Sequence, residues 1–320
     1  MRGLPAHQVT TRNLGAAYPM VAEPGLGHRG VLIGDDLLGG SFVFDPFELY
    51  QQGVLSNPNM IVFGQIGRGK SAFVKTYLWR QAVFGRRAWV VDPKGEYGAL
   101  AAAWGVTPVA LRPGGTVRLN PLERGPEAEG PPSAAGPTAG SDGRPTGAGG
   151  SGALQADHRQ VDLLASLAAT CLGRPLLPRE RVAIDLALAT VGRGPAAPTL
   201  PVVVDALLDP RPEAAAAIRT DRATLLEDGR DVALEIRRLV HGDLRGMFDG
   251  PTTPGLDLDG PLVVLDLSAL YNSAALGILM ACATAWLQAA LARRVPGPGR
   301  SPVVVVVDEA WAVLADVKIQ

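Results

Sequence analysis

Residues 64–71 read GQIGRGKS, which is a complete G-x-x-x-x-G-K-[ST] phosphate-binding loop. The apolar run before it, residues 60–63, predicts a buried parallel strand. Residues 72–84 after it predict a helix, with apolar side chains on one face at Phe73, Tyr77, Leu78 and Val83. A strand before the loop and a helix after it form the context in which this motif binds phosphate. A chance match in a chain with 39 glycines is therefore the weaker alternative.

Each residue type in this loop has a chemical task. The glycines let the backbone turn its N–H groups inward around a phosphate that lies at the helix N-terminus. Lys70 supplies a positive charge to the β- and γ-phosphates and is a candidate catalytic residue, while Ser71 offers a hydroxyl to Mg²⁺. The predicted nucleotide-binding residues here are Gly64, Gln65, Ile66, Gly67, Arg68, Gly69, Lys70, Ser71 and Ala72.

A carboxylate at the end of another buried strand is expected to complete such a site. Residues 303–307 are five consecutive valines, which predict a strand covered on both faces. Asp308 follows and is expected to hold Mg²⁺ through water, and Glu309 is expected to polarise the attacking water. The alternative is Asp266, which also ends an apolar run. It ranks lower because no second acid follows it.

A further strand is predicted at residues 88–92, and it leads into the acidic stretch DPKGEY. The carboxylates of Asp92 and Glu96 are expected at the C-terminal edge of the sheet, where open parallel sheets bind ligands. The residue types alone fit equally well a loop turned by proline and glycine that carries solvated charges.

The rest of the chain divides by composition. Residues 31–44 predict a hairpin with Gly39 and Gly40 at its turn. Residues 125–152 contain no large apolar side chain, which predicts a disordered linker or surface loop. The predicted division is a β-rich N-terminal segment (1–58), a first part of the core (59–124), the linker (125–157), a helical insertion (158–254) and a second part of the core (255–320).

Composition and charge restrict the class of protein. A net charge of −1 gives no basic field for sequence-independent nucleic-acid binding, so only a local basic patch would serve. Two solitary cysteines, Cys171 and Cys282, indicate a reducing compartment, and four scattered histidines indicate no transition-metal site. The N-terminus lacks a secretory signal. Residues 274–292 carry no charge over 19 positions, and a buried helix is favoured over a membrane span.

Six stretches occur in order between Gly30 and Trp311: PNMIVFGQIGRGKSAFVKTYLWR, WVVDPKGEY, RLNPL, MFDGPT, PLVVLDLSAL and VVVVVDEAW. In combination they resemble the conjugal-transfer and type IV secretion ATPases of the VirB-four/TraC kind, in the HerA–FtsK group of RecA-like motors. The resemblance implies an α/β fold with a RecA-like P-loop NTPase core and an inserted all-helical subdomain. It further implies a cytoplasmic hydrolase that uses ATP and Mg²⁺ at the inner membrane.

The resemblance also assigns residues and partners. Lys70 and Ser71 match the phosphate-loop pair, Asp308 and Glu309 the Walker-B pair, and Asp92 with Glu96 an acidic motif that faces the nucleotide. The expected partners of the full-length protein are further copies of itself in a hexamer and the components of a membrane channel. Two alternatives stay open: a DNA-pumping coupling-type ATPase of the same superfamily, and an ATP-binding assembly subunit with little turnover.

One departure from the family lies after the acidic pair. Family members continue with a polar sensor and an arginine that completes a neighbour's site, whereas eleven residues follow Glu309 here. The expectation is a truncated chain that is short of at least one strand, stays largely monomeric and hydrolyses slowly. Arg245 is the first candidate for an arginine supplied from within the chain.

Overall fold

The computed structural model describes residues 29–35, 40–123, 158–194, 197–242, 244–273, 275–292 and 302–311. The chain forms two compact units, which are described separately. The first consists of residues up to Ala88 together with residues 301–304, and the second of Trp89 to Arg300 together with Val305 onward.

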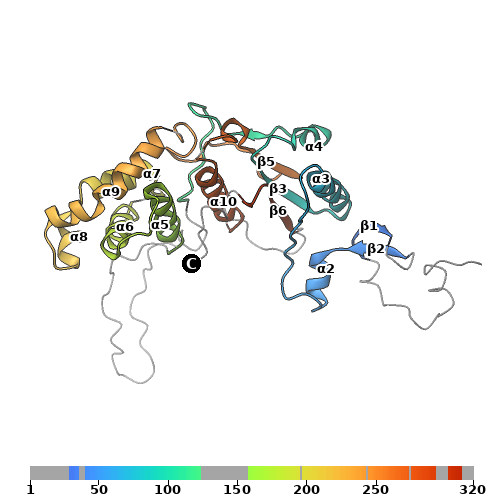
Figure 1. The fold of residues 1–320 in the computed structure, drawn as a ribbon, viewed down its shortest axis with the longest axis horizontal. Helices are drawn as coiled ribbons and strands as arrows, with labels where there is room; N and C mark the ends of the chain where they lie inside the picture. Colours follow the sequence, from blue (N-terminus) through green and yellow to red (C-terminus); the bar gives the residue numbers. More distant parts are fainter. Residues whose placement is uncertain are drawn as a thin grey trace, which may run out of the picture. The chain divides into compact units, whose positions relative to one another are not determined.

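The first unit contains a hairpin and the helix that follows the phosphate loop (Figure 1). Strands β1 (Val31–Asp35) and β2 (Ser41–Phe44) pair antiparallel, which confirms the predicted hairpin, although Gly39 of the predicted turn lies outside the described residues. The short helix α2 (Pro46–Gln51) follows, then α3 (Lys70–Gln81) and a 3₁₀ turn, η1 (Ala82–Phe84). The helix predicted after the loop is confirmed, and Tyr77 and Leu78 are its buried apolar residues.

The strand predicted at residues 60–63 is wrong for this structure. These residues have no assigned secondary structure, and the side chains of Ile61 and Phe63 are 75% and 87% exposed. An apolar run shows only that a segment is suited to burial, whereas a strand also needs a neighbouring backbone to complete its hydrogen bonds. Val83 is likewise exposed, because α3 ends before it and the chain turns there.

The second unit is built on a four-stranded sheet in the order β4-β5-β3-β6. Its strands are β3 (Arg87–Asp92), β4 (Val109–Ala110), β5 (Leu262–Asp266) and β6 (Val303–Val307), and β3 and β6 begin in the first unit. Strands β4 and β5 are parallel. Three backbone bonds align the C-terminal ends at one edge: Leu111 N to Asp266 O (2.9 Å), Leu267 N to Asp92 O (2.9 Å) and Asp308 N to Val91 O (3.2 Å).

Burial of the strands follows their place in the sheet order. The apolar residues of β3 and β5 are buried, as expected for inner strands covered by helices. The five-valine strand β6 was expected to be covered on both faces, but Val305 is 41% exposed and the other four valines are half-buried. The strand itself is confirmed. Its full burial is not, because β6 is the last strand in the order and, among the strands that the structure describes, has a neighbour on one side only.

Helices fill the remainder of the second unit. Helix α4 (Gly98–Ala103) follows β3, and five helices lie in sequence between β4 and β5: α5 (His158–Leu172), α6 (Pro178–Val191), α7 (Leu200–Leu208), α8 (Pro212–Ala217) and α9 (Arg222–His241). Helices α5, α6, α7 and α9 pack on one another. The helices predicted in this stretch are confirmed, whereas the linker predicted at residues 125–152 lies outside the described residues. That the five form a separate insertion stays a prediction.

Helix α10 (Leu276–Ala292) follows β5 and the 3₁₀ turn η3 (Ser268–Leu270). Most of its apolar residues are buried, including Leu279, Cys282 and Trp286, and it packs against α5. The buried helix predicted for this uncharged stretch is therefore confirmed. Among the helices that the structure describes, none has the length and apolar character needed to cross a bilayer.

The start of α6 gives a prediction about stability. Glu180 is buried, and its carboxylate accepts hydrogen bonds from the Arg174 guanidinium (2.6 and 2.9 Å) and from the Leu177 N–H (2.7 Å). The Arg174 bond, with the Leu177 bond adding to it, lowers the pKa of Glu180. A lowered pKa in the folded state means that this stability is present above the unfolded pKa of about 4.3 and is lost as the pH falls.

We therefore expect Glu180→Gln to reduce the free energy of unfolding by about 1–3 kcal/mol at neutral pH, and by much less near pH 3. Thermal melts followed by circular dichroism at the two pH values measure the difference. Glu227→Gln is the control, since Glu227 and Arg230 form an exposed pair at 3.8 Å, a kind of contact that contributes little. A loss for Glu180→Gln that is equal at both pH values would refute the ionic explanation.

Candidate nucleotide-binding site

The phosphate loop lies in the first unit and leads directly into α3. Gly67 and Gly69 have φ angles of 76° and 85°, in the left-handed region that glycine adopts without steric cost. The helix begins at once, with Phe73 N bonded to Gly69 O (2.8 Å). The first N–H groups of a helix have no acceptor inside it and carry the positive end of its dipole. Those of Ser71 and Ala72 are therefore placed to bind an anion.

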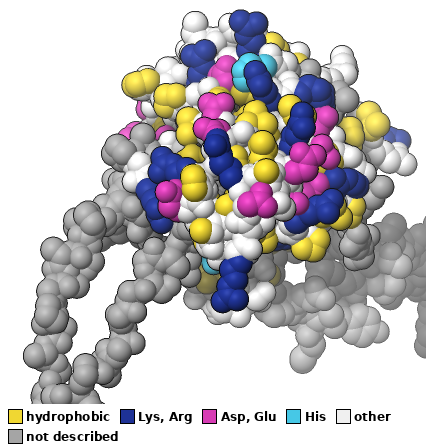
Figure 2. Space-filling view, turned by 90° about the vertical axis from the view of Figure 1, so that its left-hand side faces the viewer, with side chains coloured by type: hydrophobic (Ala, Val, Ile, Leu, Met, Phe, Trp, Pro, Cys, Tyr) yellow, Lys and Arg dark blue, Asp and Glu magenta, His cyan; other side chains and the backbone are white. Residues whose placement is uncertain are grey.

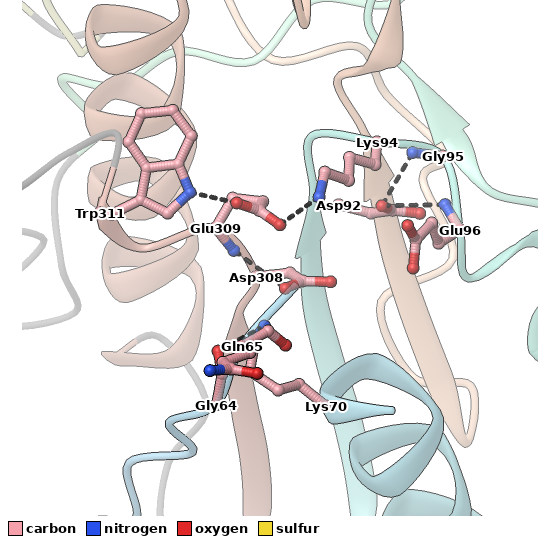
Figure 3. Close-up of polar contacts among 10 residues, drawn as sticks. All are labelled: Gly64, Gln65, Lys70, Asp92, Lys94, Gly95, Glu96, Asp308, Glu309 and Trp311. Atoms are coloured by element: carbon pink, nitrogen blue, oxygen red, sulfur yellow. Dashed lines mark hydrogen bonds and ion pairs between the residues drawn. The ribbon is translucent and has the colours of Figure 1, made fainter. Parts of the chain in front are cut away.

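Lys70 folds back over the loop. Its ammonium group donates hydrogen bonds to the carbonyl oxygens of Gly64 (2.9 Å) and Gln65 (3.1 Å), as Figure 3 shows. A Cβ at Gly64 would lie 3.3 Å from Lys70 Cγ, so this glycine makes room for the lysine stem. A phosphate oxygen carries more negative charge than a carbonyl oxygen and is the stronger acceptor for an ammonium group. The lysine is thus positioned for the role predicted for it.

The acidic residues lie in the second unit, at the C-terminal edge of the sheet. Asp92 is buried and accepts three backbone hydrogen bonds, from Gly95 N (2.8 Å), Glu96 N (3.1 Å) and Tyr97 N (2.9 Å) (Figure 3). Both of its oxygens are used in this way, so the observed task of Asp92 is to shape the loop after β3. Glu96 is the exposed carboxylate of that loop.

Glu309 is held between a lysine and a tryptophan. One carboxylate oxygen accepts a hydrogen bond from Lys94 Nζ, and the other accepts one from Trp311 Nε1 (Figure 3). The bond to Glu309 raises the pKa of Lys94. Glu309 has a φ of 52°, in the left-handed region that non-glycine residues rarely adopt and that persists where the surroundings fix it. Sequence reasoning missed Lys94, although its place between Asp92 and Glu96 was a visible signal.

Asp308 is the acid best suited to a cation. Its Oδ1 atom accepts from Glu309 N (2.9 Å), while Oδ2 is buried and has no partner within hydrogen-bond distance in the part of the chain that the structure describes. The buried phenol of Tyr97 is the neighbouring hydroxyl, and the charge of Asp308 helps to raise the pKa of Tyr97. Burial raises the pKa of Asp308, and the negative charges of Glu309, Glu96 and Asp92 raise it further. The hydrogen bond from the Glu309 backbone N–H acts in the opposite direction and lowers it. A buried carboxylate oxygen among other carboxylates is stabilised by a divalent cation such as Mg²⁺. No group of three or more Asp, Glu, His or Cys side chains that could hold a metal occurs among the described residues, so Asp308 fits a Mg²⁺ ion whose other ligands are water or phosphate oxygens.

Asp266, the alternative acid, is placed differently. It ends β5, which the sheet order separates from β6 by β3. Its Oδ1 atom accepts from Ser268 N (2.9 Å), within its own turn. The carboxylates whose charges act on Asp308 belong to Glu309 and to the loop after β3. This geometry favours Asp308 over Asp266. Arg245 is exposed after α9, and its role as an internal arginine stays a prediction.

Comparison with known proteins places this geometry in a wider context. No protein-family model and no curated protein matches the sequence. Among solved structures, VirB4 of Thermoanaerobacter pseudethanolicus is similar, with a TM-score of 0.61 and 20% sequence identity, over 90% of this chain and 70% of that chain. The parallel sheet agrees with this likeness, so the resemblance drawn from the motifs is confirmed at the level of fold. In fold, the chain is similar to VirB4, as a mixed α/β protein.

Proposed function

We propose that this chain is a Mg²⁺-dependent ATPase and a motor subunit that energises conjugal transfer or type IV secretion. The observation that carries the proposal is the acid pair at the end of β6, where Asp308 has a buried unpartnered oxygen and Glu309 follows it. The same chain contains a complete phosphate loop at the start of α3. The VirB4-like fold supports the assignment to this class of ATPase.

In the proposed reaction the loop N–H groups and Lys70 bind the triphosphate. Ser71 and Asp308 would hold Mg²⁺, which when bound neutralises charge on the phosphate oxygens. Glu309 orients a water molecule and accepts its proton as the water oxygen bonds to the γ-phosphorus and the bond to the β-phosphate oxygen breaks. Lys94 fixes the carboxylate of Glu309 by a hydrogen bond. The products are ADP and phosphate.

The setting of this activity is part of the proposal. A motor of this class assembles from several copies, as a hexamer in the reading that the family resemblance implies. It works at the cytoplasmic face of the inner membrane, against the components of a secretion or conjugation channel. The fold similarity to VirB4 supports this setting and leaves the transported substrate to experiment.

The alternative of a DNA-pumping coupling-type ATPase needs a basic surface. Figure 2 shows Lys and Arg side chains interspersed with Asp and Glu on the side where α6 to α9 lie. The ion pairs of helices α5 to α9 include Arg179–Asp228, Arg181–Asp162, Arg222–Asp209, Arg230–Glu227 and Arg238–Glu235. Charges of mixed sign give no strong positive field for a nucleic-acid backbone. The mixed charges on this face therefore give no support to the DNA-pumping alternative, and we keep the secretion motor as the proposal.

The proposal is tested by the Mg²⁺ dependence of ATP hydrolysis. We expect Asp308→Asn to raise the Mg²⁺ concentration required by about 10–100-fold, because a ligand that holds the ion through water contributes on that scale. Asp266→Asn is the matched control and is expected to leave the Mg²⁺ dependence close to wild type. Phosphate release measured across a Mg²⁺ titration gives both values. If Asp266→Asn is the more damaging change, the metal-binding strand is β5 and the assignment of Asp308 is wrong.

A further inference from the structure

A pocket of about 240 Å³ lies in the first unit, between the hairpin and α3. Strand β1 contributes Val31 and Ile33 to one wall, and successive turns of α3 form the other with Ala72, Phe73, Thr76, Tyr77 and Arg80. The rings of Phe73 and Tyr77 are stacked, with centroids 6.1 Å apart. The lining is therefore mainly apolar and aromatic, and its polar groups are the hydroxyls of Thr76 and Tyr77 and the guanidinium of Arg80.

The two walls are tied together by polar contacts. Arg80 Nη1 donates a hydrogen bond to the carbonyl of Leu32 and so joins the end of α3 to β1. Asp45, which caps α2 through Phe47 N (2.8 Å), also pairs with Arg86 at 3.2 Å beyond the end of α3. These contacts hold the hairpin and the helix in one arrangement before any ligand arrives, as is usual for small-molecule sites.

The pocket adjoins the phosphate loop along the same helix. Ala72 lines the pocket, and its backbone N–H is among the first of α3, which have no acceptor inside the helix. Phe73 is the next residue. The lining of the pocket thus begins one residue after Ser71, so a ligand whose phosphates lie on the loop at Lys70 and Ser71 has the pocket within reach of its remaining part.

We propose that this pocket binds the purine base of the nucleotide whose phosphates the loop holds, an inference that rests on the proposed function. The volume is below the about 300–1,000 Å³ of pockets that enclose a whole drug-sized ligand, so it suits one ring system rather than a complete nucleotide. Aromatic and aliphatic walls favour a flat apolar face, and a bicyclic purine offers more such surface than a pyrimidine.

The polar groups of the lining would orient the base in the pocket. The Thr76 hydroxyl donates to Ala72 O (2.8 Å), which leaves its oxygen able to accept from an amino group on the base. Tyr77 lines the pocket with a neutral phenol, and burial raises the pKa of Tyr77 further, to about 12. Gln81 Nε2 donates to this phenol (2.7 Å) and fixes its position.

The test compares ATP, GTP, CTP and inorganic tripolyphosphate by isothermal titration calorimetry with Mg²⁺ present. We expect the wild-type chain to bind ATP and GTP more tightly than CTP, and CTP more tightly than tripolyphosphate. Phe73→Ala is expected to weaken ATP binding about tenfold, the scale of one base stacked on an aromatic ring, and to leave tripolyphosphate binding unchanged. Phe73→Leu keeps an apolar side chain of similar size and is expected to weaken ATP binding in the same direction, which separates stacking from misfolding.

Phe84→Ala is the matched control, because Phe84 is a half-exposed aromatic residue of the same unit that does not line the pocket. Equal weakening of ATP and tripolyphosphate by Phe73→Ala, or no weakening of ATP, overturns the pocket assignment. Equal affinity of the wild-type chain for ATP and CTP overturns the purine preference. If the wild-type chain binds ATP and Phe73→Ala has no effect, the pocket assignment is wrong while the phosphate-loop assignment stands. If the wild-type chain binds none of the four ligands, the proposed function is overturned as well.

Discussion

Lys70→Ala is expected to remove most of the affinity for Mg-ATP while the chain stays folded. Hydrogen bonds between charged groups contribute about 1.5–3 kcal/mol, and the lysine faces the most charged part of the ligand. The expected loss is therefore at least about tenfold, since 1.4 kcal/mol corresponds to a factor of ten. Among the residues that the structure describes, the ammonium group donates hydrogen bonds to Gly64 O and Gln65 O, which lie in the loop and not in the helix, so its removal leaves the backbone of α3 in place.

Titration with a fluorescent ATP analogue, beside circular dichroism melts, measures this effect. Lys75→Ala is the control, because Lys75 lies one turn further along α3 and carries the same charge. Unchanged affinity in Lys70→Ala, or an equal loss in Lys75→Ala, would show that the phosphate loop is not the binding site.

Glu309→Gln is expected to keep Mg-ATP binding and to lose turnover by about 10²–10⁴-fold, the usual contribution of a general base. An amide has nearly the same shape as the carboxylate but accepts no proton. It also has one oxygen where Glu309 uses two, so it keeps the bond from Lys94 or the bond from Trp311 and not both. Single-turnover phosphate release, with binding measured in parallel, separates the chemical step from affinity.

The exposed Glu213→Gln at the start of α8 makes the same chemical change away from the acidic edge and is expected to have no effect. Turnover that survives in Glu309→Gln would assign the base to another residue. Absence of turnover in the wild-type chain, with binding retained, would favour the alternative of an ATP-binding assembly subunit.

Local patterns in the sequence were sufficient for most of the elements. The hairpin was predicted from its turn glycines, and β3 and β5 from their apolar runs. Each of these signals depends on neighbours in the chain, which the sequence displays directly. The phosphate loop was predictable for the same reason, since all its residues are contiguous. The uncharged run of α10 was correctly assigned to a buried helix because it follows a core strand.

What the sequence did not predict depends on contacts between distant residues. Five valines indicate a strand but not whether it is the last in the sheet, and so the exposure of Val305 was missed. The residues of DPKGEY allowed two readings for Asp92, and only the three backbone bonds to its carboxylate show that it shapes a loop. The pairing of Lys94 with Glu309 joins residues 215 positions apart. The pocket likewise forms only because β1 packs against α3, a contact between segments that are distant in the sequence.

The most direct test of the account is an experimental structure of the chain with Mg²⁺ and a non-hydrolysable ATP analogue. The central claim is that the phosphate loop and the acidic edge act on one nucleotide. The account predicts phosphates on the backbone of residues 64–72, the ion near Ser71 and Asp308, and Glu309 facing the γ-phosphate. An analogue bound away from this loop, or an ion held at Asp266 with Asp308 turned away from it, would contradict the account.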